Sequence, residues 1–169
     1  LKNDRPKVIC CTETWTHDDV SDGELSVDGY TIAVRKNRGD TTKGRGGGIM
    51  VYISEDLPWS VEDDDGTSNF NQAAYVNIGN SGSSIRLLVV YRSPNSSQQN
   101  NSALNDLLSR VTVNTVVVGD FNYPNINWEN HSASDPLGRA FLDVCDEHLL
   151  TQHVHFPTRQ ENILDLIVS

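Results

Sequence analysis

Three acidic residues stand where apolar strands are expected. Glu13 follows V-I-C-C-T, Asp120 follows V-V-V-G, and Asp165 interrupts I-L-D-L-I-V. A carboxylate near a buried strand is costly unless it is paired, hydrogen-bonded or bound to metal. At the ends of core strands the three can converge on one rim of a sheet stack. Mg²⁺ prefers oxygen ligands, usually one or two carboxylates with water and a substrate phosphate. The pattern therefore predicts a Mg²⁺ site, which Mn²⁺ could also occupy.

Each acidic residue also has a purely structural interpretation. Glu13 can cap the turn into Trp15, and Asp120 in G-D-F-N can form an Asx turn after its strand. Asp165 can be an edge-strand charge that opposes aggregation. Taken one at a time, these interpretations are favoured. Taken together at successive strand ends, the carboxylates favour the metal site.

The elements that must position these residues are mostly strands. Segments rich in Val, Ile and Tyr, bounded by turn-forming residues, predict strands at Lys7–Cys11, Tyr30–Arg35, Gly48–Ile53, Ala73–Ile78, Ile85–Tyr91, Thr115–Gly119 and Ile163–Val168. Helices are expected at Ala103–Val111, capped by Asn101–Ser102, and at Pro136–His148, capped by Ser134 or Asp135. This order predicts a layered α/β (α+β) fold, with stacked sheets flanked by helices, as one domain over residues 1–169.

Composition limits the function classes. Thirteen Lys and Arg against 23 Asp and Glu give a net charge of −10, which argues against nucleic-acid binding through bulk positive charge. This net charge is compatible with an enzyme that binds a few substrate phosphates through a metal ion. Such binding would be weak and salt-sensitive. No apolar run reaches the roughly 20 residues that span a bilayer. An odd count of three cysteines, two of them adjacent, argues against a disulfide framework and favours a reducing, intracellular compartment.

Five sequence blocks then point to a family. They are V-I-C-C-T-E-T-W (Val8–Trp15), G-G-G-I-M-V-Y-I (Gly46–Ile53), V-V-Y-R-S-P-N-S (Val89–Ser96), V-V-V-G-D-F-N-Y-P-N-I-N-W (Val116–Trp128) and F-P-T-R…I-L-D-L-I-V (Phe156–Val168). In this order they resemble the endonuclease/exonuclease/phosphatase family, most closely the apurinic-like endonuclease domain of non-LTR retrotransposons of the chicken-repeat type. The resemblance implies a β-sandwich flanked by helices. It also implies a Mg²⁺-dependent DNA endonuclease, working in the nucleus, that nicks a target strand for retrotransposition.

The resemblance also implies roles for five residues. Glu13 matches the glutamate that holds the metal, and Tyr91 the tyrosine that contacts the scissile phosphate or its leaving oxygen. Asp120 matches the aspartate that orients and deprotonates the attacking water. Asn122 matches the asparagine that hydrogen-bonds the phosphate, and Asp165 the aspartate that orients a histidine.

Further residues are expected around the substrate. By resemblance, Asn95 belongs to the same loop as the family asparagine, one residue further along, and Thr158 matches a threonine that borders the site. Arg92 is interpreted either as a phosphate contact or as an ordinary surface arginine. Five basic residues around a glycine-rich turn could either meet the DNA backbone or form a solvated loop: Arg35, Lys36, Arg38, Lys43 and Arg45. Trp15, Trp59 and Trp128 are expected to pack in the core or at its rim, with Trp128 the one to test against DNA.

The sequence departs from the family pattern at both ends. The family's S-D-H motif, with its histidine, is not reached before Ser169, and only Leu1–Pro6 precede the strand of the E-T-W block. Asn3 is too near that block to replace the metal-site asparagine of the family's first strand. We therefore expect a chain shortened at both ends. Loss of one electrostatic donor lowers the rate about 100- to 1,000-fold, so whether the chain is an active enzyme stays open.

Two alternatives follow. The chain could be a weak or inactive fragment, or a binding module on the same scaffold, although a homodimer or strand swap could complete the sheet. The same scaffold also occurs in phosphatases of small phosphoesters. The retrotransposon-like motif sequences disfavour this alternative.

Overall fold

Two sheets and a pair of helices make up the computed structural model, which describes residues 5–37, 46–62, 70, 72–80 and 82–169. An antiparallel three-stranded sheet has the order β1-β3-β2, and a mixed five-stranded sheet has the order β10-β7-β6-β5-β4. In chain order the elements are β1 (Val8–Thr12), β2 (Tyr30–Lys36), β3 (Ile49–Ser54), β4 (Trp59–Val61), β5 (Ala73–Asn80), β6 (Ser83–Tyr91), α1 (Gln98–Leu108), β7 (Thr115–Asp120), β8 (Ile126–Asn127), β9 (Ser132–Ala133), α2 (Pro136–Glu147) and β10 (Asp165–Val168). β8 and β9 form a separate small hairpin.

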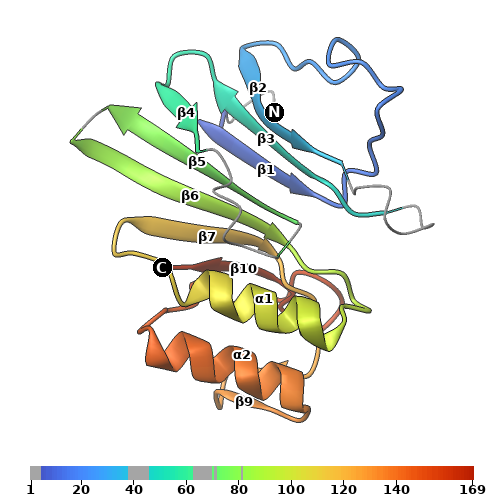
Figure 1. The fold of residues 1–169 in the computed structure, drawn as a ribbon, viewed down its shortest axis with the longest axis vertical. Coiled ribbons are helices and arrows are strands. Elements are labelled where there is room, and N and C mark those ends of the chain that lie inside the picture. The colour runs from blue at the N-terminus through green and yellow to red at the C-terminus, as the bar shows by residue number, and fades with distance from the viewer. Residues whose placement is uncertain (1–4, 38–45, 63–69, 71, 81) are drawn as a thin grey trace.

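The central strand β6 explains the layering. Its last five residues, L-L-V-V-Y, are all buried. Side chains alternate along a strand, so Leu88 and Val90 join the cluster formed with α1 and α2, whereas Leu87, Val89 and Tyr91 join the cluster formed with β3. Both helices therefore cover one face of the large sheet and the small sheet covers the other (Figure 1). This confirms the layered α/β prediction.

The helices confirm one predicted boundary and correct another. α2 begins as expected, with Asp135 as N-cap: its Oδ1 accepts from the N–H groups of Leu137 (2.9 Å) and Gly138 (3.0 Å). The prediction of a cap at Asn101–Ser102 for α1 is wrong, because the helix begins at Gln98. Ser97 caps it, with a hydroxyl that accepts from the N–H of Asn100 at 3.2 Å.

Other differences lie in short elements and in the loops. The three-residue β4 and the two-residue strands β8 and β9 are too short for an alternation pattern to predict. Trp15 is 57% exposed, so the expectation of core or rim packing is wrong for this residue. Asn3 and three of the five clustered basic residues, Arg38, Lys43 and Arg45, lie outside the described residues. None of the helices in the described part of the chain is long and apolar enough to cross a membrane.

Candidate active site

Three of the predicted site residues lie side by side across the large sheet. Tyr91 at the end of β6 is in register with Asp120 at the end of the parallel strand β7. Asp120 is in turn in register with Asp165, the first residue of the antiparallel strand β10. Tyr91 and Asp120 are buried and Asp165 is exposed. Residues in register on neighbouring strands stand close together on the same face, so the three form a row at one end of this sheet.

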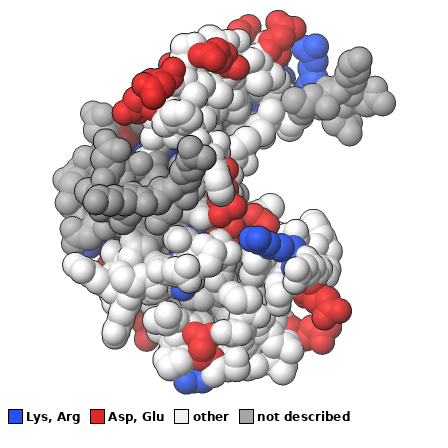
Figure 2. Space-filling model, turned by 90° about the vertical axis from the view of Figure 1, so that its right-hand side faces the viewer, with Lys and Arg blue, Asp and Glu red and all other residues white. Residues whose placement is uncertain are grey.

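The small sheet contributes Glu13 to the same place. Glu13 directly follows β1, with its backbone in the left-handed region (φ 51°). Its Oε1 accepts a hydrogen bond of 2.7 Å from the hydroxyl of Tyr91. The arrowheads of β1 and β6 lie on the same side in Figure 1, and in Figure 2, which looks onto that side, acidic side chains lie beside a hollow in the surface. Glu13 and Asp120, 107 positions apart in the sequence, are thus brought to one end of the sandwich.

The electrostatics of Asp120 suit a proton acceptor. Burial, together with the charges of Asp165 and Glu13, raises the pKa of its carboxyl group from 3.8 to about 6. The backbone N–H of Asn122 donates to Oδ1 of Asp120 at 3.0 Å and opposes the rise. A carboxylate with this pKa is still ionised at neutral pH but binds a proton more readily than an ordinary aspartate.

The loop after β7 is held by Arg92, for which the sequence leaves a phosphate contact or an ordinary surface position open. Arg92 is only 4% exposed, and its Nε donates to Oδ1 of Asn101 at 2.6 Å. One terminal nitrogen donates to the carbonyl oxygens of Phe121 (3.2 Å) and Asn122 (2.6 Å). The guanidinium also lies 3.9 Å from the ring centre of Tyr123. This burial contradicts the surface interpretation of Arg92, whereas its contact with a phosphate stays a prediction.

Asn122 is held by hydrogen bonds to both Arg92 and Asp120. It is 5% exposed, its backbone is left-handed (φ 49°), and its Nδ2 donates to the carbonyl oxygen of Arg92 at 2.9 Å. Its side chain also lowers the pKa of Asp120 by hydrogen bonding. Asn122 therefore supports Asp120 directly, and its contact with a phosphate stays a prediction. The sequence alone does not assign Asn101 to the site, because no motif links it to its hydrogen-bond partner Arg92, nine positions earlier.

Thr158 contacts the strand that carries Asp165, whereas no contact places Asn95 at the site. The Thr158 hydroxyl oxygen accepts from the backbone N–H groups of Leu164 (3.0 Å) and Asp165 (3.1 Å), and so fixes the start of β10. Asn95 is exposed in the turn between β6 and α1. Two of the basic residues expected near DNA have other partners: Arg35 binds Asp22 and the carbonyl oxygen of His17, and Lys36 donates to the carbonyl oxygen of Ala73.

A groove with a volume of about 530 Å³ lies between the segments that follow β7 and precede β10. One wall is formed by the segment that follows the G-D-F-N loop, Pro124–Glu129, and the other by residues between His155 and Ile163, which lead into β10. The first wall follows β7, which ends with Asp120, and the second wall leads into β10, which begins with Asp165. The groove is large enough for a nucleotide-sized group, although none of the three residues of the row lines it.

The donor set fits a magnesium ion, although not a preformed cage. Among the described residues, no three His, Cys, Asp or Glu side chains gather closely enough to hold a metal by themselves. Mg²⁺ usually takes only one or two carboxylates and fills its other positions with water and phosphate. Glu13 and Asp120 supply such carboxylates, and their charges oppose each other strongly enough to contribute to the raised pKa of Asp120. A divalent cation would relieve that repulsion.

Comparison with known proteins gives a family match and several similar folds. Residues 85–169 match the family model described as "Endonuclease-reverse transcriptase". The endonuclease domain of TRAS1, a telomere-specific non-LTR retrotransposon, is 14% identical with a TM-score of 0.59, over 84% of this chain and 67% of that one. The 3′-5′ exonuclease NExo from Neisseria meningitidis is 15% identical with a TM-score of 0.62, over 99% and 77%. No curated protein sequence gives a significant match. At these identities the structural likeness shows the fold.

Proposed function

Because this chain belongs to the endonuclease-reverse transcriptase branch of the endonuclease/exonuclease/phosphatase family, we propose that it is a Mg²⁺-dependent DNA endonuclease that nicks one strand for retrotransposition. The observation that carries the proposal is the convergence of Glu13, Tyr91 and Asp120 from three strands of two sheets. The TRAS1 endonuclease domain, which comes from a retrotransposon, has a similar fold and supports the same assignment.

In the proposed reaction Asp120 is the general base. Hydrolysis requires the attacking water to lose a proton as its oxygen bonds to phosphorus and the bond to the leaving oxygen breaks. Asp120 can take that proton above about pH 6, where its carboxyl group is ionised. The Asn122 N–H holds one carboxylate oxygen at 3.0 Å and so fixes the direction from which the carboxylate accepts the proton.

Tyr91 and Glu13 are assigned to the phosphate group itself. The Tyr91 hydroxyl is a hydrogen-bond donor held 2.7 Å from Glu13, so it is already directed to the site. We assign it to a non-bridging or leaving oxygen of the substrate, toward which its single proton would turn from Glu13 when the substrate binds. Glu13, with Asp120 beside it, would hold Mg²⁺. When bound, the ion would supply positive charge against the charge that develops on the phosphate.

The first experiment is a nicking assay on supercoiled plasmid with Mg²⁺ and with Mn²⁺. Asp120→Asn keeps the shape and the Oδ1 acceptor but removes the base, so we expect its nicking rate to fall at least about 100-fold. Asp143→Asn is the matched control, since it removes one charge from an exposed position on α2. Equal nicking by the wild type and Asp120→Asn would refute the proposal and indicate a contaminating nuclease.

A further inference from the structure

An exposed tryptophan closely follows the glutamate of the candidate site. Trp15 follows Glu13 by two residues and leaves 57% of its surface exposed. A tryptophan in a folded protein is usually well buried, because its ring carries a large apolar area. The exposed indole, two residues after the one that would hold the metal, is therefore accessible to a ligand.

The backbone around Trp15 is strained. Both Glu13 (φ 51°) and Trp15 (φ 55°) are in the left-handed region, which is unfavourable for a residue as bulky as tryptophan. Such strain persists only where surrounding contacts impose it, and it is found most often at functional sites. The N–H of Trp15 donates to the carbonyl oxygen of Gly47 at 3.0 Å, which ties this turn to the segment before β3.

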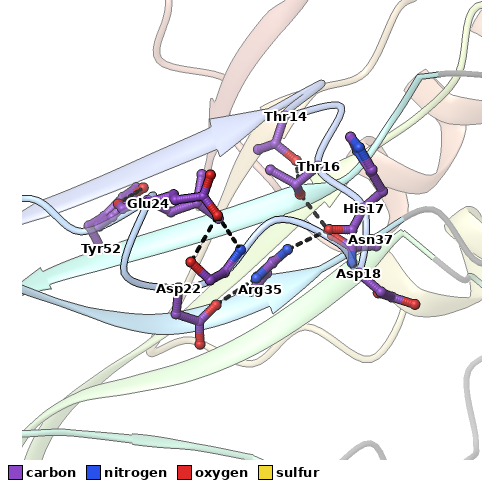
Figure 3. A network of polar contacts seen from close by, with 11 residues as sticks. Thr14, Thr16, His17, Asp18, Asp22, Glu24, Arg35, Asn37 and Tyr52 are labelled. Carbon is purple, nitrogen blue, oxygen red and sulfur yellow. Dashed lines mark hydrogen bonds and ion pairs between the residues drawn. The ribbon is translucent and has the colours of Figure 1, made fainter.

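A chain of side-chain hydrogen bonds holds the rest of the turn. The hydroxyls of Thr14 and Thr16 lie 3.2 Å apart, and Thr16 donates to Oδ1 of Asn37 at 2.7 Å. Nδ2 of Asn37 donates to Asp18 at 2.6 Å, so the chain of contacts runs from the turn to the end of β2 (Figure 3). Gly48 packs so closely on Thr14 that an added Cβ would collide with its hydroxyl. These contacts hold the turn in the conformation that leaves the indole exposed.

Among the described residues, the charges near Trp15 do not favour a role in binding phosphate. Glu13 and Asp18 are acidic, and the guanidinium of Arg35 is hydrogen-bonded to Asp22 and to the carbonyl oxygen of His17. With a net charge of −10, the chain gains little from long-range attraction to DNA. An aromatic ring, in contrast, can bind the face of a nucleobase without any positive charge, and it does so with little sequence preference.

We propose that Trp15 is a stacking platform for an unpaired nucleobase that flanks the phosphate held at Glu13 and Asp120. The ligand is thus single-stranded DNA, or duplex DNA opened next to the cleavage position, because a base within an intact stack has no free face. The inference rests on the proposed endonuclease function. It adds a substrate class, namely strands whose bases are accessible beside the site.

The test measures binding of a labelled single-stranded oligonucleotide and of the same sequence as a duplex, in the Asp120→Asn background with Mg²⁺. Loss of one stacked base weakens binding about 5- to 150-fold. We expect that range for Trp15→Leu, which keeps an apolar side chain without an aromatic face, and at most a few-fold change for Trp15→Phe. Leu149→Ala, at an 86% exposed position after α2, is the control and should not change the dissociation constant.

The outcomes separate this inference from the proposed function. Equal single-strand binding by the background protein and Trp15→Leu overturns the role of Trp15, as does equal weakening by Leu and Phe. Equal weakening of duplex and single-strand binding overturns the preference for opened DNA. Plasmid nicking by the protein with Asp120 intact stays a separate readout, so the endonuclease proposal can survive when the stacking inference fails. Thermal unfolding of each variant confirms that it is folded before binding is compared.

Discussion

Replacing Asp120 by asparagine should stabilise the folded protein while removing its proposed base. Folding raises the pKa of this carboxyl group from 3.8 to about 6, so keeping it ionised costs the folded state free energy at neutral pH. Each pKa unit corresponds to about 1.4 kcal/mol, which gives an upper limit of about 3 kcal/mol. Solvent at the end of the sheets screens part of this, and we expect Asp120→Asn to raise the free energy of unfolding by about 1–2 kcal/mol at pH 7.5.

The sign of the pH dependence is part of this prediction. A folded-state pKa above the unfolded value means that the folded protein binds the proton more tightly. Stability from this group is therefore present at low pH and falls as pH rises from about 4 to about 6. Asparagine does not titrate, so the advantage of the variant should shrink to about a fifth of its full value at pH 4.

Urea unfolding followed by circular dichroism, at pH 7.5 and pH 4 without divalent metal, measures both differences. Asp143→Asn makes the same change in net charge at an exposed position on α2 and serves as the control. An Asp120→Asn protein that is no more stable than this control at pH 7.5 would refute the electrostatic account of the site. A stability gain that is equal at both pH values would refute the assignment of the gain to ionisation.

Three further predictions follow from contacts around the site. Asp165→Asn removes a charge that raises the pKa of Asp120, so the acid limb of the pH–rate profile for nicking should move to lower pH; an unmoved limb contradicts this. Arg92→Met leaves buried carbonyl oxygens without their donor and should lower the free energy of unfolding by about 2–4 kcal/mol, measured by urea unfolding. Gly119→Ala sets a Cβ against the carbonyl oxygen of Val90 at a φ of 145°, so thermal unfolding should show a loss of at least about 1 kcal/mol.

Strand ends could be predicted well because their determinants are local. The apolar runs before Glu13 and Asp120 are terminated by polar residues, and both strands end at or next to these carboxylates. The capping of α2 was equally predictable, since Asp135 and Pro136 are adjacent in the sequence. In each case a few neighbouring residues contain the whole physical reason for the boundary.

The supporting network could not be predicted in the same way. Arg92 looked like a surface residue because an arginine is rarely buried, and only the fold places carbonyl oxygens and Asn101 around its guanidinium. The start of α1 was misplaced for a related reason. Asn101 resembles a cap by residue type, but its side chain bonds to Arg92 and to carbonyl oxygens of the preceding turn. These contacts depend on chain segments that meet only after folding.

The hydrogen bond between Tyr91 and Glu13 joins the large sheet to the small sheet. The reacting groups therefore have no single rigid support, and the apolar packing of β3 against β6 sets their separation. A larger or smaller side chain in the apolar interface between the sheets, for instance at Val51 or Val89, would shift one sheet relative to the other. Mutations far from the substrate could thus lower the activity by moving the reacting groups apart. An ion bound by both Glu13 and Asp120 would join the two sheets and oppose this movement.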